Sequence, residues 1–103
     1  MITRPDLPNQ LPKGIVAVPT SLTALTSTDS QIKHLTVTNA SGGPLTLLVE
    51  DAAHNAFIPT VTIPDKSILD FSRDDEDCAY LVGGINWQAS GAGLTAEYCI
   101  FYK

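Results

Sequence analysis

Two histidines, two cysteines and eleven acidic residues give this chain of 103 residues the side chains for several kinds of chemistry. Nucleophilic catalysis by a Ser-His-Asp triad needs its serine on a strained turn beside a positioned base. The serines here stand in ordinary turn contexts, and the G-x-S-x-G motif is absent. The sequence therefore predicts no catalytic residues, and we expect the protein not to be an enzyme.

Metal binding is the second kind of chemistry that these side chains could support. The ligand types that zinc prefers occur at His34, His54, Cys78 and Cys99. They lack the C-x₂₋₄-C and H-x₃₋₅-H spacings that bring ligands together locally. The acidic run at residues 74–77 could present oxygens to Ca²⁺, but it lacks the spacing and the glycine of an EF-hand loop. We therefore expect no metal and no cofactor, and we interpret the acidic run as a solvated loop.

The two cysteines leave two interpretations open. Cys78 and Cys99 are far enough apart in the sequence to meet on neighbouring strands and form a disulfide. A reducing compartment favours two free, half-buried thiols instead. We expect free thiols, with the disulfide as the alternative.

Recognition of a sugar is the remaining chemistry to consider. An aromatic platform could be drawn from Tyr80, Trp87, Tyr98, Phe101 and Tyr102. Alternation along residues 85–89 places Trp87 on one face with Ile85 and Ala89, which is typical of a core position. Asn39 begins an N-x-S sequon, but the first residues contain no apolar run of the kind found in a signal peptide, so we expect no glycosylation.

Composition and charge set the outer bounds on function. Hydrophobic residues at 44% and charged residues at 17% are typical of one globular domain. The formal net charge of −5, with six scattered Lys and Arg residues, argues against nucleic-acid binding, which needs a basic face. No stretch approaches the roughly 20 apolar residues of a membrane span. We therefore expect neither nucleic acid nor membrane as a partner, and synthesis in a cytoplasm.

Short runs rich in Val, Ile, Thr and Leu with period-2 alternation indicate strands, and no ten-residue window shows a helical stripe. The predicted fold class is all-β: a single antiparallel β-sandwich of about seven or eight short strands. The predicted core consists of Leu35, Val37, Leu47, Val49, Val61, Ile63, Leu69, Phe71, Ile85 and Trp87.

Local pairing is predicted from turn residues and faces. Residues 31–39 place Lys33, Leu35 and Val37 on one face and Ile32 on the other. The turn residues at 40–44 predict a hairpin with residues 45–51. Prolines at 59 and 64 predict that residues 57–63 form an edge strand. Residues 99–102 are apolar on both faces, as in a central strand or an assembled interface.

Residues 1–14 form a distinct stretch before the sandwich domain, which we place at residues 15–103. Three prolines mark it at near-regular spacing: Pro5, Pro8 and Pro12. Because proline prevents both helix and central strand, the stretch is predicted to be an extended N-terminal arm outside the sheets. The arm could bury apolar side chains on a neighbouring subunit, and a frayed terminus is the alternative. Together with the end of the last strand, the interface candidates are Ile2, Leu7, Leu11, Phe101 and Tyr102.

Five segments carry a resemblance to a known class of proteins. They are Leu35-Thr36-Val37-Thr38-Asn39, Gly43-Pro44-Leu45-Thr46-Leu47, Val61-Thr62-Ile63-Pro64, Leu69-Asp70-Phe71 and Leu81-Val82-Gly83-Gly84-Ile85-Asn86-Trp87-Gln88-Ala89-Ser90. In this pattern of strand and turn residues the chain resembles the small all-β structural proteins of tailed bacteriophages, which decorate heads or form parts of tails.

The resemblance implies a non-enzymatic virion protein, made in the host cytoplasm and needing no cofactor. Its implied role is that of a capsid decoration or cement protein that binds the head lattice. The implied partners are further copies of itself, as a trimer on a threefold lattice position, and the major capsid protein or another virion protein. Two alternatives stay open: a phage tail or host-recognition module, including a carbohydrate-binding one, and a cellular adhesion-type domain.

Overall fold

The computed structural model describes residues 7–72 and 80–103, and for Pro12 and Lys13 it describes the backbone alone. Within these residues the chain is all-β and contains no helix. The strands are β1 (Asn9–Ala17), β2 (Thr23–Thr26), β3 (Ser30–Asn39), β4 (Leu45–Asp51), β5 (Ala56–Ile63), β6 (Ile68–Ser72), β7 (Tyr80–Leu81), β8 (Ile85–Ala89) and β9 (Leu94–Tyr102). The described residues thus form nine strands, where the sequence predicted seven or eight.

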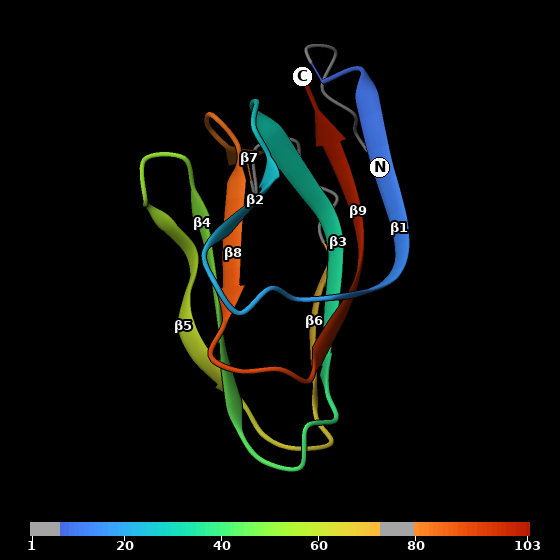
Figure 1. Ribbon diagram of the computed structural model, residues 1–103. Coiled ribbons are helices and arrows are strands. Elements are labelled where there is room, and N and C mark those ends of the chain that lie inside the picture. The colour runs from blue at the N-terminus through green and yellow to red at the C-terminus, as the bar shows by residue number, and fades with distance from the viewer. Residues whose placement is uncertain (1–6, 73–79) are drawn as a thin grey trace.

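The strands form two antiparallel sheets, as in a β-sandwich (Figure 1). Sheet A has the order β1-β9-β3-β6, and β7 also pairs with β3. Sheet B has the order β2-β8-β4-β5. The connection from β1 to β2 crosses the front of Figure 1 from one sheet to the other. The described edge strands of the two sheets are therefore β1 and β2 on one side of the body, and β6 and β5 on the other.

One apolar core lies between the sheets and takes side chains from both. Seven of the predicted core residues are buried: Leu35, Val37, Leu47, Val49, Ile63, Ile85 and Trp87. The other three are partly buried against the same core: Val61, Leu69 and Phe71. Trp87 contacts Tyr98 edge to face, with ring centroids 5.9 Å apart. The prediction that Trp87 belongs to the core is confirmed.

The alternation of faces along β3 changes at one residue. The register between β3 and β9 shifts between Ile32 and His34, which leaves Lys33 as an extra residue in a bulge. The extra residue brings Ile32 to the same face as Leu35, and each side chain is only 1% exposed. The prediction that Ile32 and Leu35 lie on opposite faces is therefore wrong, because strict alternation cannot reveal a bulge.

The predicted hairpin between residues 31–39 and 45–51 is also wrong. β3 lies in sheet A and β4 lies in sheet B, so residues 40–44 carry the chain from one sheet to the other. Turn residues indicate that a chain reverses, but they do not show whether the two strands pair or stack across a core. The predicted edge position of residues 57–63 is confirmed, because β5 is the last strand of sheet B.

A buried asparagine fixes this passage between the sheets. The side chain of Asn39 is 0% exposed. Its Nδ2 donates to the carbonyl oxygens of Gly43 at 2.9 Å and Ile63 at 2.7 Å, and its Oδ1 accepts from the N–H of Ser41 at 3.0 Å. The backbone oxygen of Asn39 accepts from the N–H of Lys66 at 2.8 Å. One residue thus joins the β3–β4 turn to the end of β5 and the β5–β6 turn.

Residues 9–14 are not part of an arm outside the sheets. β1 pairs with β9 from Asn9 opposite Tyr102 to Ala17 opposite Thr95, and Pro12 stands opposite Cys99. An edge strand tolerates proline, since the missing N–H need not face a neighbouring strand. The predicted N-terminal arm is therefore not confirmed: its boundary after residue 14 falls inside β1, and residues 1–6 lie outside the described residues.

Replacing Asn39 with alanine should lower the free energy of unfolding by about 2 to 4 kcal/mol, because three hydrogen bonds are lost in a buried site. Urea denaturation measures this loss. Asn86 is a half-buried asparagine of β8, and Asn86→Ala is the matched control with an expected loss below about 1 kcal/mol. Equal losses in the two variants would show that Asn39 has no special part in joining the sheets.

Candidate functional site

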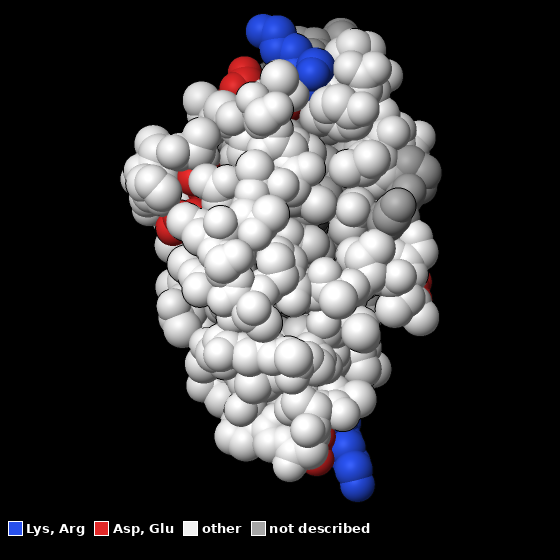
Figure 2. Space-filling view, viewed as in Figure 1, with Lys and Arg blue, Asp and Glu red and all other residues white. Residues whose placement is uncertain are grey.

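One long segment at the side of the two sheets carries no charged residue. Residues 14–28 contain no Asp, Glu, Lys, Arg or His. They run from the end of β1 through the crossing to β2 and into the β2–β3 turn. Ile15 is 72% exposed and Leu22 is 42% exposed on this segment. Figure 2 shows that charged side chains on this face of the molecule gather toward its two ends and rims. We call residues 14–28 the uncharged side.

The uncharged side also contains open sheet edges. β1 is the last described strand of sheet A, and β2 is the last strand of sheet B on the same side. An edge strand presents backbone N–H and C=O groups that can pair with another chain, and proteins commonly guard such edges with charged side chains. Residues 14–28 supply no such charge. The arrangement therefore suits contact with another protein surface.

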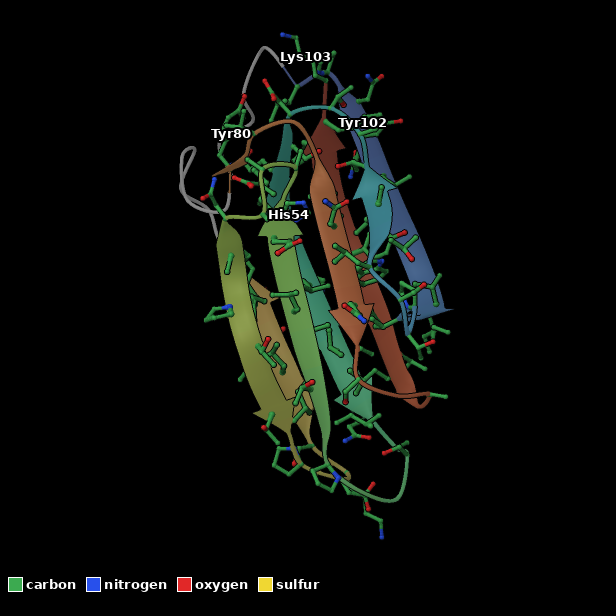
Figure 3. The ribbon with its side chains drawn as sticks, turned by 60° about the vertical axis from the view of Figure 1, so that its left-hand side comes forward. His54, Tyr80, Tyr102 and Lys103 are labelled. Carbon is green, nitrogen blue, oxygen red and sulfur yellow. The ribbon has the colours of Figure 1, made fainter. Side chains whose placement is uncertain are left out.

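A cleft of about 300 Å³ lies where the uncharged side meets the end of β9. Its lining residues are Leu11, Leu25, Thr26, Ser27, Thr28, Tyr102 and Lys103. Leu11 and Tyr102 come from sheet A, and Leu25 comes from β2 of sheet B, so the cleft opens between the sheets. Figure 3 labels Tyr102 and Lys103 at this end of the body. Apolar walls with hydroxyl groups at the rim fit an apolar side chain of a protein partner.

The rim of the cleft is held in place by Asp29. Its Oδ1 accepts from the N–H of Gly83 at 2.7 Å, and its Oδ2 accepts from the hydroxyl of Tyr80 at 3.0 Å. The backbone oxygen of Asp29 accepts from the N–H of Lys103 at 3.0 Å. The hydroxyl of Thr28 donates to the carbonyl oxygen of Lys103 at 2.9 Å. These bonds join the β2–β3 turn to β7, to the β7–β8 turn and to the last residue, so the cleft has a fixed rim.

The predicted interface residues fall at different places. Leu11 and Tyr102 are half-buried and line the cleft. Phe101 is half-buried on the outer face of sheet A, since its neighbours in β9 alternate between the core and the outside. Leu7, which the sequence placed in an arm outside the sheets, is fully buried within its own chain. Ile2 lies outside the described residues, and the interface role of all five stays a prediction.

His34 belongs to a chain of hydrogen bonds on the outer face of sheet A. Its Nδ1 lies 3.0 Å from the hydroxyl of Ser72, and its Nε2 lies 3.0 Å from the hydroxyl of Thr36. Thr36 in turn donates to Oδ1 of Asp70 at 2.9 Å. His34 stands directly opposite Ser72, and Thr36 stands directly opposite Asp70, across β3 and β6. We interpret the group as cross-strand pairs that stabilise the sheet rather than as a catalytic triad.

The other residues considered as metal ligands are scattered. Cys99 is opposite His34 in the β3–β9 register and accepts a hydrogen bond from Nε2 of Gln10 at 3.3 Å. Its thiol is free and half-buried. Cys78 and the acidic run lie outside the described residues. In the part of the chain that the structure describes, no group of three or more His, Cys, Asp or Glu side chains is placed to hold a metal ion.

His54 of the β4–β5 turn pairs with Glu50 near the end of β4, and Figure 3 labels His54 there. Nδ1 of His54 lies 2.6 Å from Oε1 of Glu50, and the side chains are 66% and 9% exposed. The hydrogen bond to Glu50, and then the charge of Glu50, raise the pKa of His54. In the same turn the N–H of Asn55 is the main cause that lowers the pKa of Asp51. The pair fixes the turn that joins two neighbouring strands.

A shallow hollow of about 190 Å³ lies over sheet B, on strands β4, β5 and β8. Its lining residues are Thr46, Leu48, Thr60, Gln88, Ala89 and Ser90. Gln88 donates from Nε2 to the carbonyl oxygen of Thr20 at 3.2 Å, and Ser90 accepts at Oγ from the N–H of Thr46 at 2.8 Å. Hydroxyl and amide groups around a leucine, with no charge, suit a neutral ligand that carries hydroxyl groups.

The sequence interpretation missed the uncharged side, although its signal is present in the sequence. Charged residues stop at Lys13 and begin again at Asp29. The cleft had no such signal, because it depends on the approach of β2 to the ends of β1 and β9 from the other sheet.

Comparison with protein-family models, with curated proteins and with solved structures finds no match. Among the described residues, no helix has the length and apolar character needed to cross a membrane. We therefore infer function from the surfaces of the chain itself.

The His54–Glu50 pair predicts a pH-dependent stability. Because the pKa of His54 is raised on folding, its protonated form stabilises the fold fully below the unfolded pKa of about 6.5, and this contribution is lost as the pH rises through the raised value. Asp51 has a lowered pKa and stays ionised across this window. The melting temperature of His54→Asn should fall below that of the wild type by more at acidic than at basic pH.

Asparagine suits this test because His54 has a φ of 66°, a left-handed conformation that asparagine tolerates. The same substitution in a Glu50→Gln background is the control, and there the effect of pH on the difference should disappear. A difference in melting temperature between the wild type and His54→Asn that is the same at acidic and at basic pH would contradict this account of the pair.

Proposed function

We propose that this chain is a non-enzymatic structural protein of a bacteriophage virion, a single antiparallel β-sandwich that decorates or cements the capsid lattice as a homo-oligomer. The observation that supports this best is the uncharged side, together with the cleft at its end. Its part around β2, with exposed Leu22 and the cleft that Leu25 lines, is the surface that we assign to the lattice protein.

The physical reason is the cost of removing charged groups from water. Burying a charged side chain without a matched partner is unfavourable, whereas the side chains of residues 14–28 are apolar or carry hydroxyl groups. Burial of exposed apolar surface such as Leu22 contributes roughly 25 cal/mol per Å². The cleft rim that Asp29 fixes is already ordered before binding, which lowers the entropic cost of association.

The resemblance to phage structural proteins supports the same proposal. Its segments fall on β3, on the β3–β4 turn and β4, on β5, on β6 and on β7–β8. Those elements build the two-sheet body, and none of the five segments includes a residue of the uncharged side. Binding specificity would then come from residues 14–28, and the shared body would act as the scaffold.

Fractionation of phage particles tests this proposal. Particles from an induced culture are separated on a density gradient, and mass spectrometry measures the ratio of this chain to the major capsid protein. We expect a constant ratio across the particle fractions, because a decoration protein occupies a fixed lattice position. Finding the chain only among free proteins at the top of the gradient would contradict the proposal.

Binding of the purified chain to particles from which it has been stripped tests the surface assigned to the lattice protein. Leu22→Glu should weaken binding to stripped particles by about tenfold or more, because it places a charge on a surface that is buried in the complex. Val82 is 60% exposed outside residues 14–28, so Val82→Glu is the matched control and should bind as the wild type does.

A host-recognition module that binds carbohydrate is the second candidate function. The hollow over sheet B favours it, because Thr60, Gln88 and Ser90 offer neutral hydrogen-bonding groups around Leu48. Binding of a neutral oligosaccharide that Gln88→Ala abolishes, and that Gln10→Ala leaves intact, would favour this candidate over the first.

A further inference from the structure

We infer that the cleft between the sheets binds the C-terminal residue of a partner polypeptide, with an apolar side chain against Leu11 and Leu25 and the terminal carboxylate beside Lys103. The inference rests on the proposed function, because it names the part of the lattice protein that enters the cleft. It gives the partner a chemical identity, which the lack of charge over residues 14–28 does not provide.

Lys103 is the only charged residue among the described residues that line the cleft. Its backbone is held in place, because its N–H donates to the carbonyl oxygen of Asp29 at 3.0 Å and its carbonyl oxygen accepts from the hydroxyl of Thr28 at 2.9 Å. Its ammonium group makes no ion pair with a described residue. The carboxylate of Asp29 accepts from Gly83 and Tyr80 instead. The cleft therefore presents a positive charge on a protein whose formal net charge is −5.

The hydroxyl groups of the cleft complement a negative ligand. Oγ1 of Thr26 already lies 2.6 Å from Oγ of Ser30 and accepts from the N–H of Ile85 at 3.1 Å. The hydroxyls of Ser27 and Tyr102 make no hydrogen bond to a described residue. Each can donate to a carboxylate, as the ammonium group can, and such charge-assisted hydrogen bonds are stronger than neutral ones. Charges farther away than roughly 8 Å are largely screened at physiological ionic strength, so the local cation outweighs the net charge of the chain.

The size of the cleft and the geometry of an extended chain select the end of a polypeptide as the occupant. A volume of about 300 Å³ is at the lower end of the range for ligand pockets, so the cleft has room for about one residue. In an extended segment successive side chains point to opposite sides, so an acidic side chain and the apolar side chain next to it cannot enter one cleft. At a C-terminal residue the carboxylate and the side chain share one Cα atom, and both reach the same site. Capture of a terminal carboxylate by donor groups is a recurrent mode of peptide recognition.

Titration of the isotope-labelled full chain with acetyl-leucine, followed by amide chemical shifts, tests the inference. Acetyl-leucine carries an apolar side chain and a free carboxylate, and acetyl-leucinamide is the matched ligand without the charge. We expect saturable shifts at residues 25–28 and 102–103, and a dissociation constant for acetyl-leucinamide that is higher by about threefold or more. Lys103→Gln should remove this difference between the two ligands. Lys66→Gln is the matched control and should keep it, because Lys66 is an exposed lysine of the β5–β6 turn at the opposite end of the body (Figure 1).

Two further arms identify the source of the carboxylate. Decanoate carries a carboxylate on a longer apolar chain, and it should bind no more tightly than acetyl-leucine, because the cleft has room for about one residue. Tighter binding of decanoate would assign the cleft to a fatty acid and overturn the inference. Carboxypeptidase treatment of stripped particles should weaken binding of the wild-type chain, and unchanged binding would also overturn it.

The amide spectra also show whether each variant stays folded, as expected for substitutions at exposed sites. Equal dissociation constants for the two leucine ligands, no shifts at the cleft, or the same effect of both lysine substitutions would overturn the inference. The titration contains no particle, so its failure is distinguishable from failure of the proposed function. A chain that binds particles without preferring acetyl-leucine rejects the inference alone, and a chain that prefers acetyl-leucine but is absent from particles rejects the virion role alone.

Discussion

A buried amide, that of Asn39, joins the two sheets at one end of the core. Its three side-chain hydrogen bonds satisfy backbone groups of the β3–β4 turn and the end of β5 inside the body. Because β3 belongs to sheet A and β5 to sheet B, the bond to Ile63 opposes sliding of one sheet along the other. The core contacts between the sheets, including the Trp87–Tyr98 pair, require the sheets to keep this alignment, because close packing tolerates little displacement.

The position of the uncharged side follows from how the chain connects the two sheets. Most connections between described strands cross from one sheet to the other. The β4–β5 connection does not, because these two strands are neighbours in sheet B. The first crossing leaves β1 and β2 as edges on the same side of the body. The residues that make this crossing are then exposed along much of their length, and their lack of charge decides which surfaces they can contact. At the far end, the bonds of Asp29 hold the turn that lines the cleft.

Much of this architecture is predictable from the sequence, and the exceptions have physical reasons. Alternation identifies the inward faces of β4 and β8, and the prolines identify β5 as an edge, because both depend on local geometry. Pairing partners are not local, so the turn residues at 40–44 predict a hairpin although β3 and β4 lie in different sheets. The bulge at Lys33 and the strand pairing of Pro12 depend on the opposing strand β9. The cleft requires both sheets, and no local pattern could indicate it.

The central claim is that residues 14–28 form a surface that is buried when the protein assembles. Hydrogen–deuterium exchange of the dilute chain and of the assembled form, on particles or at high concentration, tests it directly. Backbone amides that gain a partner or lose contact with water exchange more slowly. The account predicts slower exchange of amides within residues 14–28 on assembly, with the amides of β6 unchanged. Unchanged exchange over residues 14–28, or protection that appears on β6 instead, would contradict it.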